Sequence, residues 1–233
     1  SAASDVYKRQ CAELAKEHNL LMITDNTFLS PYLQNPIALG ADIVIHSASK
    51  FLCGHNDTIA GFVCSAKEEL AAKIRLIAKT TGGCLSPFDS WLVMRGIKTL
   101  AVRMERQQEN AGNIARWLTE QKKVRKVYYA GLETHPGYEI NAKQARGAGA
   151  MISFDVDSVE TAQRVLEKVR VITFAESLGG TESLITYPMK QTHPDVPKEW
   201  REKLGITDTL LRLSVGLEHV DELIADLEQA FVS

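Results

Sequence analysis

The stretch ITDNTFLSPYLQNPIALGADIVIHSASKFLCGHNDTIAGFV, residues 23–63, carries the strongest structural signal in this chain. Three apolar runs of strand length lie in or across it: LLMITD (20–25), ADIVIHSAS (41–49) and TIAGFVCS (58–65). Near-continuous apolar runs are typical of strands that are buried on both faces of an α/β sheet. Helical patterns at residues 7–18 and 67–80 flank the runs, so we expect helices and strands in alternation.

The second apolar run ends in two hydroxyls and an amine, at Ser47, Ser49 and Lys50. In an extended segment residues two apart point to the same side, so Ser47 and Ser49 are predicted to converge on one anion, such as a phosphate. Lys50 then projects beside that anion. A lysine partly withdrawn from water has a lowered pKa and can form a Schiff base. Taken alone, these residues fit a strand end with a surface lysine more often than a site.

A carboxylate, Asp25, ends the first apolar run. Ligands of α/β sheets gather at the carboxyl ends of strands, where a carboxylate can pair with a protonated ring nitrogen. An Asp that caps the next turn is an equally good interpretation of this residue by itself.

Arginine interrupts the apolar strand pattern LLRLSVGLE, residues 210–218. Leu211, Leu213 and Val215 are predicted to share one face of that strand, while Arg212 and Ser214 share the other. The planar guanidinium of an arginine that faces a cleft suits a carboxylate. By itself, an arginine on a solvated sheet face is the commoner outcome.

Taken together, these stretches resemble the Cys/Met metabolism family of pyridoxal-phosphate (PLP) enzymes, which includes cystathionine β-lyase, γ-synthase and γ-lyase. The matching pieces are Asp25-Asn26-Thr27, Pro31-Tyr32-Leu33-Gln34, Gly40-Ala41-Asp42, His46-Ser47-Ala48-Ser49-Lys50 and Gly54-His55-Asn56-Asp57. The resemblance continues through SPFDSWLVMRGIKTLAVRMERQQENA (86–111), ESLGGTESLITYP (176–188) and LLRLSVGLEHVDELIADLEQAF (210–231). It covers nearly all of the chain after about residue 11.

The resemblance implies an α/β fold of the fold-type I PLP-dependent transferase class, with a partial large domain and a smaller C-terminal α+β domain. We assign residues 1–100 to the C-terminal part of the PLP-binding large domain and residues 101–233 to the α+β domain. A long helical pattern from Ser86 toward Gln121, with possible bends at Gly96 and Gly112, is predicted to cross between them.

The resemblance also assigns the cofactor residues. Lys50 is expected to hold PLP covalently and to act as the catalytic acid/base. Asp25 is expected to bond the pyridinium nitrogen. Ser47 and Ser49 are expected to bind the cofactor phosphate, although the family usually has Thr in place of Ser49, a change that keeps the hydroxyl.

Two further residues are assigned to the substrate on the same ground. Arg212 is expected to clamp the α-carboxylate of a sulfur-containing amino acid, and Ser177 to help place that carboxylate and the lysine. The reaction most similar by sequence is that of cystathionine β-lyase, which yields homocysteine, pyruvate and ammonia. The γ-synthase and γ-lyase reactions remain alternatives, and a cytoplasmic homotetramer is the implied assembly of the parent protein.

The family's chains are longer, and their cofactor lysine lies deeper in the sequence than residue 50. The chain is therefore expected to hold only part of the cofactor site and to leave hydrophobic surface uncovered. The first residues, SAASDVYKRQ (1–10), lack a hydrophobic period and indicate a processed or foreign start. An inactive fragment that serves as an interaction module thus remains an alternative, as does, more weakly, a Schiff-base aldolase that uses Lys50 without PLP.

The composition limits the partners. The net charge of −2 and the absence of a basic patch argue against nucleic acid, and no apolar run approaches membrane-spanning length. The four cysteines form no pair or Cys/His set with zinc-like spacing, so we expect no metal and interpret them as reduced thiols that pack as small hydrophobes. His46 and His55 are interpreted as structural hydrogen-bonding residues.

Overall fold

A computed structural model describes residues 7–232 of the chain, which fold into two compact units. The first unit contains the chain up to Val102 together with residues 136–148, and the second contains residues 103–135 and the chain from Gly149 onward. Helix α6 (Leu100–Thr119) begins in the first unit and continues in the second.

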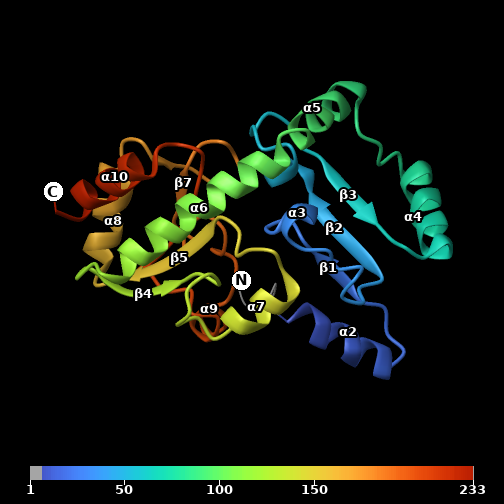
Figure 1. The fold of residues 1–233 in the computed structure, drawn as a ribbon, viewed down its shortest axis with the longest axis horizontal. Helices are drawn as coiled ribbons and strands as arrows, with labels where there is room; N and C mark the ends of the chain where they lie inside the picture. Colours follow the sequence, from blue (N-terminus) through green and yellow to red (C-terminus); the bar gives the residue numbers. More distant parts are fainter. Residues whose placement is uncertain (1–6, 233) are drawn as a thin grey trace. The chain divides into compact units, whose positions relative to one another are not determined.

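A three-stranded sheet forms the centre of the first unit (Figure 1). Its strands, in spatial order, are β1 (Ile23–Asp25), β2 (Ile43–Ser47) and β3 (Gly61–Cys64). β1 and β2 run parallel, with Asp25 opposite Ile45, and β3 is antiparallel to β2. The strands are shorter than the apolar runs in the sequence, because residues outside regular strand pairing occupy one or both ends of each run.

Helices of the first unit connect these strands. They are α2 (Lys8–Glu17), α3 (Ser30–Leu33), the π-helical turn η1 (Ala48–Leu52), α4 (Glu68–Thr81), α5 (Pro87–Ile97) and α7 (Tyr138–Gln144). A small apolar core joins α2 to the sheet through Ala12, Met22, Ala41 and Val44. One face of β1 and β2 is thereby buried.

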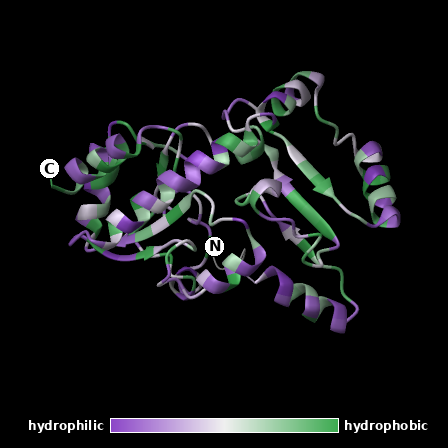
Figure 2. Ribbon diagram, viewed as in Figure 1, coloured by the Kyte–Doolittle hydropathy of each residue, from purple (hydrophilic) through white to green (hydrophobic). Residues whose placement is uncertain are grey.

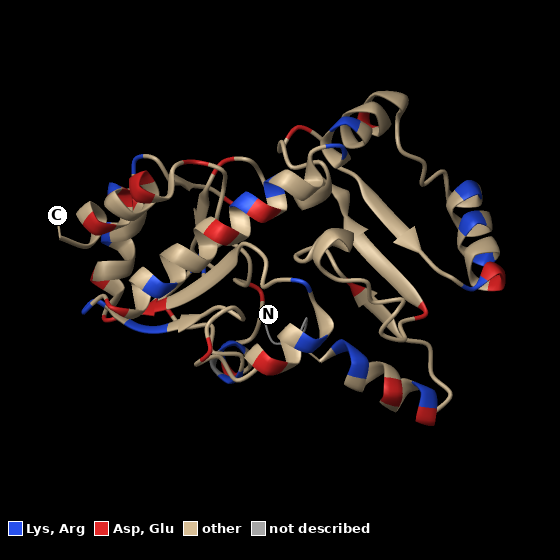
Figure 3. Cartoon of the chain, in the orientation of Figure 1, with Lys and Arg blue, Asp and Glu red and all other residues tan. Residues whose placement is uncertain are grey.

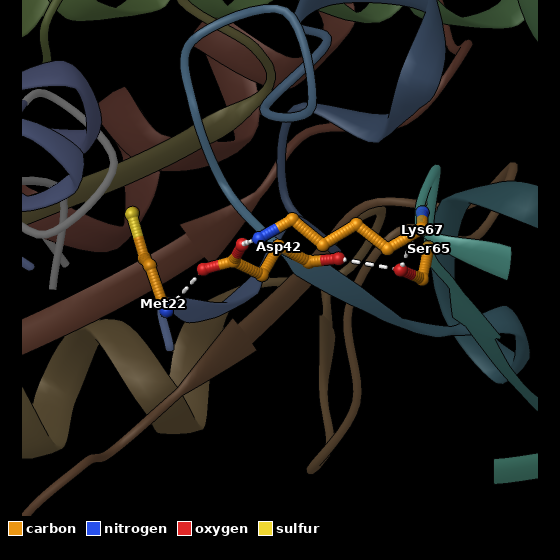
Figure 4. A network of polar contacts seen from close by, with 4 residues as sticks. All are labelled: Met22, Asp42, Ser65 and Lys67. Carbon is orange, nitrogen blue, oxygen red and sulfur yellow. Dashed lines mark hydrogen bonds and ion pairs between the residues drawn. The ribbon is translucent and has the colours of Figure 1, made fainter. Parts of the chain in front are cut away.

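A polar network around Asp42 ties the ends of three strands together (Figure 4). The Asp42 carboxylate accepts a hydrogen bond of 2.7 Å from the backbone N–H of Met22 and pairs with the ammonium of Lys67. Ser65 donates from its hydroxyl to the backbone carbonyl of Asp42 at 2.8 Å. The network therefore joins the start of β1, the start of β2 and the segment after β3.

The expectation that the three strands are buried on both faces is wrong. Ile23 and Asp25 of β1 and Ile45 of β2 are exposed, and the departure is largest for β3. All four of its residues are exposed, although Figure 2 shows the strand to be largely hydrophobic. Helix α4 has no buried residue, and in Figure 1 it stands away from the sheet. Its charges follow the helix dipole, with Glu68 and Glu69 in the first turn and Lys79 in the last (Figure 3). None of the described helices covers the outer side of β3.

The second unit is built on a five-stranded sheet with the order β4-β5-β8-β7-β6. Its strands are β4 (Val124–Tyr128), β5 (Met151–Val156), β6 (Thr173–Phe174), β7 (Leu184–Thr186) and β8 (Leu210–Ser214). β8 lies at the centre and is antiparallel to both β5 and β7, while β6 pairs in parallel with β7.

Helices α6, α8 (Val159–Lys168) and α10 (Val220–Val232) pack on this sheet, and α9 (Lys198–Lys203) lies in the connection to β8 (Figure 1). Alternate residues of β5 are fully buried, including Ile152 and Phe154. The ring of Phe231 from α10 packs edge-on against Phe154 and stacks on Trp117 of α6. The aromatic contacts fix both helices on one face of the sheet.

The long helix predicted from Ser86 breaks between Ile97 and Leu100, at neither Gly96 nor Gly112. The helix start is as predicted, because the Ser86 hydroxyl caps α5 by accepting the Asp89 N–H. Helices α3, α7 and α9 and strand β7 were missed, since each is a short element without a clear hydrophobic period.

The segment 136–148 differs from the sequence-based division, which placed all of residues 101–233 in one domain. It belongs to the first unit because Arg146 donates its N–H to the Leu33 carbonyl at 2.8 Å and lies over the Tyr32 ring. Gln144 in α7 also accepts the N–H of Arg9 at 3.1 Å.

The packing expected for the cysteines holds only for Cys53, which is buried. Cys11, Cys64 and Cys84 are exposed, and all four are free thiols. Of the odd first segment, residues 1–6 lie outside the described part of the chain, and Tyr7 precedes α2. Within residues 7–232, no helix is both long and apolar enough to cross a membrane.

Candidate active site

The carboxyl ends of β1 and β2 meet at one edge of the first sheet, as parallel pairing requires. Asp25 ends β1 and Ser47 ends β2, and Thr27 links the two. The Thr27 N–H donates to Asp25 Oδ1 at 2.8 Å, and the Thr27 Oγ1 accepts the Ser47 N–H at 2.8 Å. Asp25 is exposed at this edge, so its carboxylate is held in place and open to a ligand.

Lys50 lies in the π-helical turn that follows β2 directly. Its backbone is non-helical, with φ −95° and ψ −131°, and it interrupts the turn. Ala48 and Phe51 on either side are fully buried, whereas Lys50 is half-buried. Buried neighbours therefore anchor the backbone from which the lysine side chain projects. Asp25 ends β1 and Lys50 follows the end of β2, and these two strands end at the same sheet edge.

Ser49 lies beyond the end of β2, in the turn and not in the strand. Its hydroxyl accepts the Ala60 N–H at 2.9 Å and is 3.3 Å from the Ala60 carbonyl, to which it donates. Strand alternation therefore does not apply to the pair Ser47 and Ser49, and their predicted convergence lacks the physical basis first given for it. The Ser49 hydroxyl thus connects the turn that contains Lys50, here called the lysine turn, to the segment that precedes β3.

A buried polar cluster lies behind this edge and was missed by sequence reasoning. The ammonium of Lys8 is buried and donates to Asn26 Oδ1 and to Gln34 Oε1, each at 2.7 Å. Asn26 in turn donates from Nδ2 to the Ser30 and Gln34 carbonyls at 3.0 Å. The cluster fixes the residue that follows Asp25. The one feature of the sequence that could have indicated this cluster is the pair of amide side chains, Asn26 and Gln34, that follows Asp25.

The two histidines near the lysine turn have different surroundings. His46 is buried, and burial lowers its pKa, while the Asp25 carboxylate raises it and the Lys8 ammonium lowers it again. The Nδ1 of His55 lies 2.7 Å from the Cys53 carbonyl. No group of three or more His, Cys, Asp or Glu side chains suited to a metal occurs within residues 7–232.

Arg212 occupies the central strand β8 of the second unit, opposite Ser153 on β5 and Thr186 on β7. Leu211, Leu213 and Val215 are fully buried on the helix-covered face, and Arg212 is half-buried. The guanidinium Nη2 donates to Thr186 Oγ1 at 3.4 Å. Its Nε is buried and has no hydrogen-bond partner among the described residues.

Burial lowers the pKa of Arg212, and the nearby Glu176 carboxylate opposes this shift. A buried guanidinium with an unsatisfied N–H is costly unless an anion completes its hydrogen bonds. The surroundings of Arg212 thus suit a carboxylate ligand, since a carboxylate supplies two acceptors in one plane.

Ser177 lies in the loop ESLGG (176–180), which is hydrogen-bonded to β8 within the same unit. The Gly179 N–H donates to the Ser214 hydroxyl at 2.8 Å, and Gln107 of α6 donates to the Gly180 carbonyl at 2.6 Å. Because Ser214 and Arg212 share one face of β8, the structure brings the Ser177 loop to the strand that carries Arg212. The first unit holds Lys50, Asp25, Ser47 and Ser49.

A lysine and a carboxylate near the carboxyl ends of parallel strands, and a half-buried arginine on a separate sheet, are the arrangement expected of a PLP enzyme of fold type I. The chain belongs to the family described as Cys/Met metabolism PLP-dependent enzyme, whose sequence profile matches residues 3–232. Both the family and the fold class predicted from the sequence are confirmed.

Individual relatives carry different reaction names. The chain is 50% identical over 222 residues to a cystathionine β-lyase of Lactococcus lactis subsp. cremoris, covering 95% of this chain and 58% of the relative. It is 48% identical over 224 residues to a cystathionine γ-synthase of Haemophilus influenzae, covering 96% of this chain and 56% of the relative.

Among solved structures, a cystathionine γ-lyase from Lactobacillus plantarum complexed with L-serine matches with a TM-score of 0.94 and 46% identity. The match covers 97% of this chain and 59% of that one. The chain thus spans somewhat more than half the length of the relatives it matches.

Proposed function

We propose that the protein to which this chain belongs cleaves the carbon–sulfur bond of a sulfur-containing amino acid with PLP as cofactor. The observation that carries the proposal is the placement of Asp25 at the end of β1 and of Lys50 just after the parallel strand β2, at one sheet edge where Thr27 bonds both Asp25 and Ser47. Lyases and a synthase acting on cystathionine among the relatives support this class of substrate.

The residues present fit the donor set that the cofactor needs. The Lys50 amine would hold it covalently, the exposed Asp25 carboxylate would accept the hydrogen bond of the pyridinium nitrogen, and the Ser47 hydroxyl would bind the phosphate. We assign the Ser49 hydroxyl a smaller part in binding the phosphate, because it already forms hydrogen bonds with the Ala60 N–H and carbonyl. The unsatisfied Nε of Arg212 suits the substrate α-carboxylate, with Ser177 in the loop beside its strand.

When bound, PLP serves as an electron sink for charge that develops at the substrate α-carbon. The amine of Lys50 accepts the α-proton and returns a proton to the departing thiolate, which is general acid–base catalysis by one positioned group. The carboxylate of Asp25 keeps the ring nitrogen protonated by its negative charge. Arg212 orients the substrate by binding both oxygens of its carboxylate.

Within this class we favour the β-lyase reaction, in which cystathionine and water give homocysteine, pyruvate and ammonia. The Lactococcus β-lyase, at 50% identity, supports this choice over the γ-synthase at 48% by only a small margin. The γ-elimination and γ-replacement reactions require one more proton shift, at the β-carbon, and can use the same lysine. A homotetramer of the whole protein is part of the same proposal, on the ground of family resemblance.

The test is to incubate the chain with PLP, reduce with borohydride, and map the pyridoxyl group by mass spectrometry. Label confined to Lys50 and absent from a Lys50→Arg variant is the expected result. Label spread over surface lysines in both proteins would contradict the assignment of Lys50 in this chain. Products from cystathionine then separate the reactions, since pyruvate reports β-cleavage and 2-oxobutyrate reports γ-cleavage.

A second candidate function, a non-catalytic interaction module, is favoured by one observation. Large apolar side chains are exposed on the first unit, among them Ile59, Phe62 and Val63 around β3 and Leu76 and Ile77 on α4. Exposed apolar patches of this kind mark interaction surfaces.

A further inference from the structure

Helix α5 contacts the lysine turn η1, and it also holds the two segments that flank this turn. The first is Cys53, immediately after the turn. An added Cβ at Gly96 of α5 would lie 2.2 Å from the Cys53 carbonyl oxygen and 2.7 Å from its Cα. The helix backbone therefore presses directly on the backbone of Cys53, and no side chain fits between them.

The second flank is the segment from Thr58 to Ala60, which precedes β3. The Thr58 hydroxyl donates to Asp89 Oδ1 in the first turn of α5 at 2.6 Å. The other oxygen of this carboxylate, Oδ2, accepts from the Ser86 hydroxyl at 2.6 Å. These two bonds, that from Ser86 first, hold the pKa of Asp89 below its usual value, so the carboxylate is charged at neutral pH.

Ala60, two residues after Thr58, is the direct support of the lysine turn. Its carbonyl accepts the N–H groups of Ala48 at 2.8 Å and Ser49 at 3.2 Å. Its own N–H donates to the Ser49 hydroxyl at 2.9 Å. These three bonds all end on the two residues that precede Lys50. A displacement of the Thr58–Ala60 segment therefore moves the backbone that presents Lys50.

We propose that Asp89 is a positioning residue for Lys50, acting through Thr58. The Asp89 carboxylate accepts the hydrogen bond of Thr58 and so fixes the position of this residue. Thr58 lies two residues before Ala60, and the Ala60 backbone is hydrogen-bonded to Ala48 and Ser49 in the turn. The sequence motif Ser86-Pro87-Phe88-Asp89 thus has a second role besides starting a helix. A helix start needs only the bond from the Asp89 N–H to the Ser86 hydroxyl, whereas the bond to Thr58 adds nothing to the cap.

The inference rests on the proposed function for the role of Lys50, and its test separates the two by reading Lys50 without any cofactor. The variant Thr58→Val removes the donor hydroxyl and keeps the side-chain shape, and Thr58→Ser restores the hydroxyl. Asp89→Ala removes the acceptor. Ser90→Ala, in the same turn of α5, removes a hydroxyl that bonds the Ser86 carbonyl and serves as the matched control.

The first readout is the rate at which acetic anhydride modifies Lys50, relative to the exposed Lys79 of α4, with hydrogen exchange of residues 54–60 measured alongside. Loss of a hydrogen bond to a charged group raises local opening by about tenfold. We therefore expect Thr58→Val and Asp89→Ala each to change the relative rate severalfold, with no further change in the double variant. Thr58→Ser and Ser90→Ala should match the unaltered chain.

Circular dichroism of each variant shows that the fold is retained. An unchanged Lys50 rate in folded Thr58→Val would overturn the inference, as would additive effects of Thr58→Val and Asp89→Ala. PLP trapping forms the second readout. If even the unaltered chain shows no pyridoxyl group on Lys50, the proposed function fails for this chain, while the acetylation rates still decide the role of Asp89.

Discussion

At the residue scale, Arg212 is a charge that the second unit buries without fully satisfying it. Its Nε lacks a partner among the described residues, and burial lowers its pKa. Replacing an incompletely paired buried charge by an apolar side chain of similar length often stabilises a protein. We expect Arg212→Met to raise the unfolding free energy by about 1 kcal/mol and to abolish binding of amino-acid carboxylates. Urea unfolding and calorimetric titration with L-serine measure the two effects, and a loss of stability in Arg212→Met would contradict this view.

Lys8 is the opposite case, since its buried ammonium has hydrogen-bond acceptors at 2.7 Å from both Asn26 and Gln34. Lys8→Met would leave both amide oxygens without this donor, so we expect a loss of about 1–3 kcal/mol in unfolding free energy. Lys16→Met on the exposed side of the same helix is the control, with an expected effect within about 0.5 kcal/mol. Equal urea midpoints for the two variants would show that the Lys8 contacts do not stabilise the fold.

At the element scale, two glycines in neighbouring helices give opposite predictions. Gly96 in α5 touches the Cys53 backbone, whereas a Cβ at Gly112 in α6 would meet only the end of the Arg116 side chain, at 3.6 Å. Gly96→Ala is expected to destabilise the chain by about 2 kcal/mol or more, because the helix must move away from the lysine turn. Gly112→Ala is expected to stabilise it by about 0.5–1 kcal/mol, since alanine favours a helix interior. Thermal unfolding of both variants checks the pair, and similar shifts in the two would be inconsistent with the close approach at Gly96.

The network at Asp42 predicts how the pairing of β1, β2 and β3 responds to pH. The hydrogen bond from Lys67, and after it that from the Met22 N–H, holds the pKa of Asp42 below its usual value. A carboxyl whose pKa is lower in the folded than in the unfolded state stabilises the fold above its unfolded pKa, and this is lost as the pH falls through the folded value. Asp42→Asn should therefore reduce the unfolding free energy by about 1 kcal/mol at pH 7, and by much less at about pH 3. Urea titrations of both proteins at the two pH values give the comparison, and a difference independent of pH would rule this role out.

At the scale of the whole molecule, the first unit exposes apolar side chains that favour association between chains. Ile59 is 90% exposed, and the strand β3 beside it has no buried residue. We expect the chain to self-associate with rising concentration, and the double variant Ile59→Lys/Val63→Lys to remain monomeric over the same range, because charge blocks apolar contact. Sedimentation velocity checks this, and identical profiles for both proteins would remove the support for an interaction surface around β3.

The sequence by itself was enough to predict the family and the fold class through the resemblance of its motifs, and both are confirmed. It also allowed Asp25 and Lys50 to be proposed as site residues, because the residues that end an apolar run can be identified from order along the chain. Asp25 and Lys50 could be proposed as a pair because ligands gather where parallel strands end. Strand length could not be predicted in the same way: the run that ends at Ser49 becomes a turn after Ser47, since the Ala60 backbone competes for its hydrogen bonds.

Tertiary structure alone decided three further features. The need for a glycine at position 96 arises from the close approach of the Cys53 backbone. The sequence of the helix alone indicates no more than a possible bend at Gly96. Lys8 is buried because Asn26 and Gln34, far along the chain, accept its hydrogen bonds. Asp89 reaches Thr58 as well as its own helix start. Each depends on groups distant in sequence that folding brings within hydrogen-bonding or van der Waals distance, and no local pattern encodes such a distance.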